Sequence, residues 1–152
     1  KHRQWRPDLW LRFKNRTGNI WVEGKCCEMK FHSSKRWHTK GLNTFQEQSN
    51  EANKRLTAVR NDLDASGYQV RDLLVHVHFV LANVPQEIWR SWTPKQRKAE
   101  IDNLKTEIER GNTVKSVGWN DSRFHAREGV PRNYAKNDAV YPGVFFVTQV
   151  IA

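Results

Sequence analysis

Apolar and polar residues alternate near the start of the chain in the way that a half-buried β-strand requires. The alternation covers residues 9–14, and a second apolar run follows at 20–22. Between them, residues 15–18 (Asn-Arg-Thr-Gly) supply turn-forming side chains, with a glycine free to take positive φ. The pattern predicts a β-hairpin over residues 6–25, with residues 26–31 as a continuation of its second strand.

Helical periodicity begins after the hairpin. Apolar residues at 3.6-residue spacing between residues 44 and 66 predict a helix that starts with a Thr44/Glu47 capping box and ends before Gly67. A near-continuous apolar run over residues 69–82 then predicts a central strand that is buried on both faces. The order strand, helix, strand favours a parallel crossover unit.

The remaining segments are predicted from shorter patterns. In chain order they are a polar loop over 33–41, a short amphipathic helix or turn over 85–92, a helix over 93–111 capped by Thr93 and Gln96, polar loops over 112–139, and a buried strand over 140–150. These elements predict the α/β class, with a mixed β-sheet that starts with the hairpin and is flanked by helices.

Composition indicates one folded domain. The chain has 152 residues, of which 38% are hydrophobic, so it is long enough for a core and too apolar for disorder. No apolar run approaches the roughly 18–20 residues of a membrane span, so we expect no membrane partner. Because the sequence starts at Lys1 rather than Met, we expect a domain excised or processed from a longer chain, whose remainder is one candidate protein partner.

The charge is strongly positive and unevenly placed. The formal net charge is +10, and residues 1–40 contribute +8 of it, with eleven Lys or Arg against three acidic residues. A basic region of this kind favours a polyanionic partner, most often nucleic acid. The only cysteines, Cys26 and Cys27, are adjacent and would point to opposite faces of a strand, which favours free, buried thiols and a reducing intracellular compartment.

The hairpin gathers charged residues. If residues 15–18 form a four-residue loop, Trp10 lies opposite Glu23 and Asp8 lies opposite Lys25, so Asp8, Glu23 and Lys25 share one face. Two carboxylates on adjacent strands can bind Mg²⁺ or Mn²⁺, and the lysine places an ammonium beside the ion. A bare salt-bridged hairpin is the alternative, and Glu28 with Lys30 offers the same spacing in a second register.

The arrangement resembles a known nuclease signature. Pro7-Asp8, then fourteen residues, then Glu23-Gly24-Lys25 after an apolar run is similar to the motif of the PD-(D/E)xK, or restriction-endonuclease-like, superfamily. The resemblance implies a restriction-endonuclease-like core and an endonuclease, with DNA favoured over RNA. It further implies that Asp8 and Glu23 bind the metal and that Lys25 assists the attacking water. Many members carry another acidic residue on a preceding helix, for which Glu51 or Asp62 would be substitutes here.

Several residues are candidates for nucleic-acid contact. The basic candidates are Arg6, Arg12, Lys30, Lys35 and Arg36, and the resemblance adds the helix glutamines Gln46 and Gln48. A second basic group at residues 123–136 is a further candidate.

Two other functions remain open. One is a non-enzymatic nucleic-acid-binding domain that uses some of its seven tryptophans for base stacking. The other rests on His76 and His78, whose HxH spacing resembles the metal-binding strand of HUH single-strand nucleases. That resemblance implies an attacking tyrosine on a later helix, for which Tyr134 and Tyr141 are available.

Overall fold

The chain folds as a mixed α/β structure around a six-stranded sheet. The computed structural model describes residues 8–12, 18–67, 72–110, 116–120 and 139–151. Its elements are β1 (Leu9–Arg12), β2 (Asn19–His32), β3 (Arg36–Trp37), α1 (Thr39–Ala65), β4 (Leu73–Pro85), α2 (Gln86–Ser91), α3 (Pro94–Glu109), β5 (Ser116–Asn120) and β6 (Ala139–Ile151). The strand order is β1-β2-β4-β6-β5, and β3 pairs with β2 outside this path. The predicted fold class is confirmed, including the hairpin at the start of the sheet.

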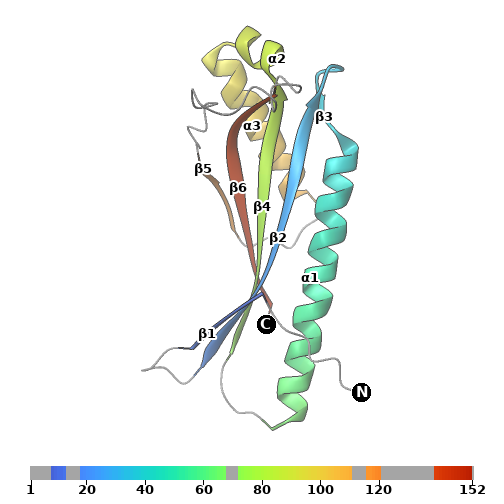
Figure 1. Ribbon diagram of the computed structural model, residues 1–152, viewed down its shortest axis with the longest axis vertical. Helices are drawn as coiled ribbons and strands as arrows, with labels where there is room; N and C mark the ends of the chain where they lie inside the picture. The colour runs from blue at the N-terminus through green and yellow to red at the C-terminus, as the bar shows by residue number, and fades with distance from the viewer. Residues whose placement is uncertain (1–7, 13–17, 68–71, 111–115, 121–138, 152) are drawn as a thin grey trace, which may run out of the picture.

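The crossover between the two longest neighbouring strands is parallel, as predicted. β2 and β4 run parallel from Ile20 beside Leu73 to Lys30 beside Asn83, and all other strand pairs in the described part of the chain are antiparallel. The connection between them is α1, a long helix that lies alongside β2 in Figure 1. None of the described helices combines the length and the hydrophobicity needed to cross a bilayer.

The hairpin forms with a register different from the predicted one. Trp10 faces Trp21 and Leu11 faces Ile20, so the predicted pairing of Trp10 with Glu23 is wrong. Extending the observed pairing by one residue sets Asp8 opposite Glu23 instead of Lys25. The shift between the two registers is two residues, and side chains alternate with period two, so the same residues still share a face. The predicted turn falls largely on residues 13–17, which lie outside the described residues.

α1 starts five residues earlier than predicted. His38 is its N-cap, with its ring nitrogen accepting from the Lys40 N–H, and Thr44 lies inside the helix with its hydroxyl bonded to the Lys40 carbonyl. The predicted Thr44 capping box is therefore wrong, and residues 33–41 contain β3 and the first turn of α1 in addition to the predicted loop. The predicted end is confirmed, because Gly67 follows the C-cap Ser66 with a φ of +68°.

A close approach explains why the helix can begin so early. A Cβ at Gly41 would lie 2.8 Å from the Met29 sulfur and 3.1 Å from the Glu28 carbonyl oxygen. Only glycine lets the first turn of α1 pack this tightly against β2. The packing outweighs the low helix propensity of glycine.

β4 is buried on one face instead of the predicted two. Along the strand, Leu74, Val80 and Ala82 are fully buried, whereas Leu73 is 47% and Phe79 39% exposed. The buried face packs against both long helices, since one cluster contains Phe45 of α1, three residues of α3, and residues of β2, β4 and β6. Among the described residues, no helix contributes to a cluster on the other face, so the strand alternates like an antiparallel one.

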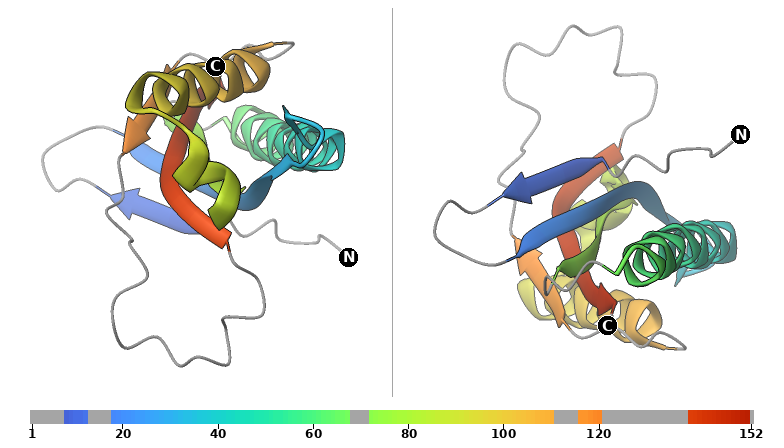
Figure 2. Two further views of the ribbon diagram at one scale, coloured as in Figure 1. Left: turned by 90° about the horizontal axis from the view of Figure 1, so that it is seen from above. Right: turned by 90° about the horizontal axis from the view of Figure 1, so that it is seen from below.

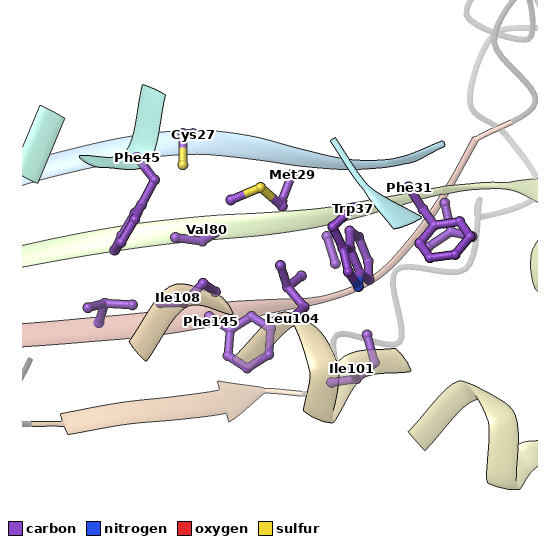
Figure 3. Close-up of a cluster of buried hydrophobic side chains, with 13 residues drawn as sticks. Cys27, Met29, Phe31, Trp37, Phe45, Val80, Ile101, Leu104, Ile108 and Phe145 are labelled. Carbon is purple, nitrogen blue, oxygen red and sulfur yellow. The ribbon is translucent and has the colours of Figure 1, made fainter. Parts of the chain in front are cut away.

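The main core lies between the sheet and α3 (Figure 3). The predicted apolar stripe of α3 is confirmed, with Ile101, Leu104 and Ile108 all buried against Val80 and Phe145. α3 starts as predicted, with a capping box between Thr93 and Gln96. Full burial of each large aliphatic side chain contributes about 1.5–3 kcal/mol. The view from above in Figure 2 shows α3 and α1 as separate helices, and side chains of both enter the same cluster.

Two strands in the second half of the chain differ from the prediction. Ser116–Asn120 forms β5 within the predicted loops, and the final strand extends over Ala139–Ile151, through Pro142 and Gly143. The short helix predicted over 85–92 is confirmed as α2. Residues 69–71 of the predicted strand and the basic group at 123–136 lie outside the described residues.

A buried aspartate joins the starts of β2 and β4. Asp72 is 4% exposed, and its carboxylate accepts hydrogen bonds from the Asn19 backbone N–H (2.9 Å), the Asn19 side-chain amide (3.1 and 3.2 Å) and the Trp21 indole N–H (2.6 Å). Its carbonyl accepts from Arg60 of α1 at 2.7 Å. One residue therefore connects two parallel strands and the helix that crosses between them.

We expect Asp72→Ala to lower the free energy of unfolding by on the order of 3 kcal/mol, because it leaves buried donors without an acceptor. Urea denaturation measures this decrease. Asp64→Ala, at an exposed position of α1, is the control and should change the value by less than about 0.5 kcal/mol. Equal decreases in the two variants would show that the Asp72 bonds do not join the strands.

Candidate functional site

The three predicted catalytic side chains lie near one another where β1 meets β2. Glu23 and Lys25 are two residues apart on β2, so they share the face covered by α1, and Lys25 Nζ lies 3.4 Å from Glu23 Oε1. Asp8 precedes β1, and its Oδ2 accepts a hydrogen bond from the Gly24 N–H at 2.7 Å. The side chains of Glu23 and Lys25 are thus in contact, and Asp8 bonds to the backbone of the residue between them.

α1 adds two charged residues to this group. Arg55 Nη1 lies 2.8 Å from Glu23 Oε1, and Arg55 Nη2 lies 2.5 Å from Glu51 Oε1. Lys25 Nζ also reaches Glu51 Oε2 at 3.5 Å. We call Asp8, Glu23, Lys25, Glu51 and Arg55 the charge cluster. Glu51 was one of two substitutes expected for the family's additional acidic residue, and the other, Asp62, is exposed near the end of α1.

Arg55 was missed by the sequence analysis. With Glu51 it makes an i,i+4 pair, and such pairs are common on exposed helix surfaces, so the sequence carries no signal that separates it from a surface salt bridge. In the structure the pKa of Arg55 is raised, first by its hydrogen bond to Glu23 and also by the charges of Glu23, Glu51 and Asp8, against an opposing effect of burial. Of the three carboxylates, Glu23 and Glu51 contact the guanidinium directly, and Asp8 acts on its pKa through its charge.

The two candidate histidines lie beside the charge cluster. In the parallel pairing, His76 is the neighbour of Glu23 and His78 the neighbour of Lys25. His76 is 2% and His78 0% exposed, and the two rings are 5.5 Å apart between centroids. The hairpin site and the HxH site are therefore neighbouring parts of a single polar region beneath α1.

Both imidazoles are neutral in this environment. Burial, followed by the charge of Lys25, lowers the pKa of His76 to about 4. Burial, followed by His76 and Lys25, lowers the pKa of His78 to about 3. His78 Nδ1 lies 3.4 Å from the Ser49 hydroxyl, while the Nε2 atoms of both rings are buried with no hydrogen-bond partner among the described residues.

The donor set fits a hard divalent cation better than a transition metal. Asp8 and Glu23 offer carboxylate oxygens, and Mg²⁺ commonly takes one or two carboxylates and completes its shell with water and phosphate oxygens. Among the residues that the structure describes, no group of three or more His, Cys, Asp or Glu side chains is arranged to hold a metal ion. Two imidazoles fall short of the three or four protein ligands of a zinc site. Glu23 is also paired with Lys25 and Arg55, both through Oε1, so a metal ion at that oxygen would compete with them.

The second ExK pair lies on the other face of the sheet. Glu28 and Lys30 are five and seven residues after Glu23, so their side chains point to the opposite face of β2. Glu28 is bonded to Asn83 and to the Tyr141 hydroxyl. The alternative register that would bring them to Asp8 is therefore wrong. Tyr141 lies in a strand instead of a helix, with its hydroxyl on Glu28 and away from the histidine pair. Tyr134 lies outside the described residues.

The predicted nucleic-acid contacts are spread over several elements. Arg12 is exposed at the end of β1, and Lys30, Lys35 and Arg36 are exposed around the β2–β3 turn, which we call the basic tip. β2 rises by about 3.3 Å per residue, so Lys30 lies about 23 Å along the strand from Glu23, and Arg36, which pairs with His32, lies about 30 Å from it. On α1, Gln46 bonds to Asn50, and the side-chain amide oxygen of Gln48 is buried without a partner in the described part of the chain. Arg6 is outside that part.

The cysteines lie on opposite faces of β2 as predicted, but the predicted burial holds for Cys27 alone. Both are free, with Cys26 exposed and Cys27 buried, so adjacent residues point to opposite faces. Burial, with a smaller effect of Cys26, raises the pKa of the Cys27 thiol to about 12. Cys27 is thus an unreactive core residue and not a nucleophile.

Comparisons with protein-family models, with curated proteins and with solved structures found no match for this chain. The geometry and chemistry of the charge cluster and of the basic surface are therefore the basis for a functional proposal.

The neutral histidines predict a pH-dependent stability. Because their folded pKa values lie below the usual 6.5, the unfolded chain binds protons that the folded chain does not. The stabilisation is complete above about pH 6.5 and is lost as the pH falls toward 4, by up to about 1.4 kcal/mol per pH unit for each histidine. Urea denaturation between pH 7.5 and 5 measures the slope.

The double variant His76→Gln, His78→Gln should reduce this slope, whereas His32→Gln, at an exposed position, should leave it unchanged. The double variant should also lower the free energy of unfolding at pH 7.5. If its slope equals that of the wild type, the two imidazoles do not titrate as buried neutral groups.

Proposed function

We propose that this chain is a metal-dependent nuclease that hydrolyses phosphodiester bonds of nucleic acid, with DNA favoured over RNA by the resemblance alone. The observation that carries the proposal is the proximity of three charged residues from two neighbouring segments: Lys25 Nζ lies 3.4 Å from Glu23 Oε1, and Asp8 bonds to the N–H of Gly24, the residue between them. A restriction-endonuclease-like core is part of the proposal, supported by the hairpin, the α1 crossover and the parallel pairing of β2 with β4.

In this proposal each residue has a role that its environment suits. Glu23 is 2% exposed and fixed by β2, so it would provide a rigid carboxylate. Asp8 is exposed and would provide a second carboxylate that solvent can reach. The two would bind Mg²⁺ or Mn²⁺, which when bound activates water and stabilises charge on the phosphate. Lys25, whose side chain is 16% exposed, would orient the attacking water and donate to a phosphate oxygen.

The basic surface would position the substrate. Phosphate contacts fix the register of a nucleic acid without reading its sequence. Because the basic tip lies about 23–30 Å from Glu23, a nucleic acid that touches both must span about seven to nine nucleotide steps of 3.4 Å. Arg12 shares a strand face with Asp8 and would contact the backbone close to the scissile bond.

A second candidate is a nucleic-acid-binding domain without catalysis. It is favoured by Trp10, which is 51% exposed and packs against Trp21 with the ring centroids 6.0 Å apart. Such a ring is available for base stacking, which contributes about 1–3 kcal/mol per base. Nucleic-acid binding that EDTA leaves unchanged, together with an absence of cleavage, would select this function over the nuclease.

The catalytic roles predict separate effects on cleavage and binding. Asp8→Asn and Glu23→Gln should each abolish Mg²⁺-dependent cleavage of plasmid and single-stranded DNA, because they remove the negative charge that the ion needs. Nucleic-acid binding should persist. Lys25→Ala should reduce the rate by a factor of about 10² or more with binding retained, since its contribution is made in the transition state.

Glu28 of the second ExK pair provides a matched control. Glu28→Gln makes the same chemical change as Glu23→Gln on the other face of the sheet and should leave the cleavage rate within about twofold. Melting curves should show that all variants fold. If the Asp8 and Glu23 variants cleave as fast as the wild type, these carboxylates have no catalytic role and the hairpin is only a salt-bridged pair of strands.

The basic surface predicts a change in salt dependence. Reversing the charge at Arg12, Lys30 and Arg36 should weaken binding and lower the log–log slope against salt by about one unit for each phosphate that the protein no longer neutralises. Reversal at Lys95, Lys98 and Lys105 on α3 is the control. Fluorescence anisotropy with a 20-base-pair duplex measures both sets. Equal effects from the two sets would mean that the charge acts as a diffuse field.

A further inference from the structure

Arg55 connects the most buried carboxylate of the charge cluster to an exposed one. Its guanidinium binds Glu23 through Nη1 at 2.8 Å and Glu51 through Nη2 at 2.5 Å. Glu23 is 2% exposed, whereas the Arg55 side chain is 39% exposed and that of Glu51 50%. Glu23 is thus fixed within the sheet, while the group that covers it is a long side chain with access to solvent.

The charges of the cluster show what Arg55 balances. Three carboxylates, Asp8, Glu23 and Glu51, face two cations, Lys25 and Arg55, which gives these five residues a net charge of −1. Without Arg55 the remaining four carry −2, the charge that one divalent cation neutralises. Because a buried carboxylate requires a compensating charge, Arg55 and a metal ion are alternative partners of Glu23.

We propose that Arg55 is the counter-ion that a divalent metal replaces at Glu23, and that the released guanidinium then binds a phosphate of the nucleic acid. This inference rests on the proposed nuclease function. Arg55 is a positioning residue with two successive partners, first Glu23 and then phosphate. A guanidinium suits both, since its planar fork binds carboxylate and phosphate in the same bidentate geometry.

The exchange couples the two binding events. Metal binding frees Arg55 for the phosphate, and phosphate binding removes Arg55 from Glu23, so each ligand should tighten the binding of the other by the same factor. A structural salt bridge has no such effect. It would stabilise the fold slightly and leave metal affinity unchanged when removed.

Titration with Mn²⁺ alone, followed by the electron paramagnetic resonance signal of the free ion, tests the first half. Arg55→Gln should bind Mn²⁺ at least about fivefold more tightly than the wild type. Glu23→Gln should lose binding. Arg110→Gln, which removes an ion-paired arginine of similar type near the end of α3, should match the wild type. Arg55→Lys keeps the positive charge that competes with the metal, so it should bind Mn²⁺ with an affinity close to that of the wild type, and a tighter affinity would contradict the role of Arg55 as counter-ion.

Anisotropy with a cleavage-resistant phosphorothioate oligonucleotide tests the second half. Mn²⁺ should tighten oligonucleotide binding in the wild type, and this tightening should be at least about fivefold smaller in Arg55→Gln. An unchanged tightening would overturn the transfer of Arg55 to phosphate.

The two proposals fail in different ways. If Mn²⁺ binds in a Glu23-dependent manner with equal affinity to the wild type and Arg55→Gln, the role of Arg55 is overturned and the metal site remains. If neither protein binds Mn²⁺, the metal site of the proposed function is wrong and the role of Arg55 is overturned with it.

Discussion

The carboxylate of Asp72 is the constraint on which the arrangement of the polar region depends. It binds the backbone and side chain of Asn19 and the indole of Trp21, and so fixes how β4 lies beside β2. In the same register, Glu23, two residues after Trp21, lies beside His76. A parallel pair has no connecting turn to define its register, so a buried hydrogen-bonded group at one end takes over that task.

The sequence predicted the class of the fold and the members of the site better than their exact pairing. Period-two alternation identified the hairpin and the shared face of Asp8, Glu23 and Lys25, but it fits pairings that differ by two residues equally well, which is why Trp10 was matched with Glu23 instead of Trp21. The early start of α1 depends on the contact of Gly41 with Met29, and β5 depends on pairing with β6. Such long-range contacts override local propensity.

The charge cluster illustrates why a site is harder to predict than a fold. Asp8 and Glu23 could be found because strand geometry alone brings them together, whereas Arg55 comes from a helix whose rotation relative to the sheet is set by packing of Leu56 and Val59 against Leu74. The sequence shows the same i,i+4 pattern that occurs on any exposed helix. Only the packed structure shows that one end of this pair reaches a carboxylate that is 2% exposed.

The sheet face opposite the helices has a consequence for how this molecule behaves in concentrated solution. Among the described residues it exposes Leu9, Leu11, Leu73 and Phe79, on a chain whose net charge is +10. At low ionic strength, mutual repulsion keeps such surfaces apart, and added salt screens that repulsion while leaving hydrophobic attraction intact. Ionic strength therefore acts in two directions on this protein, weakening its attraction to polyanions while promoting contact between its own copies.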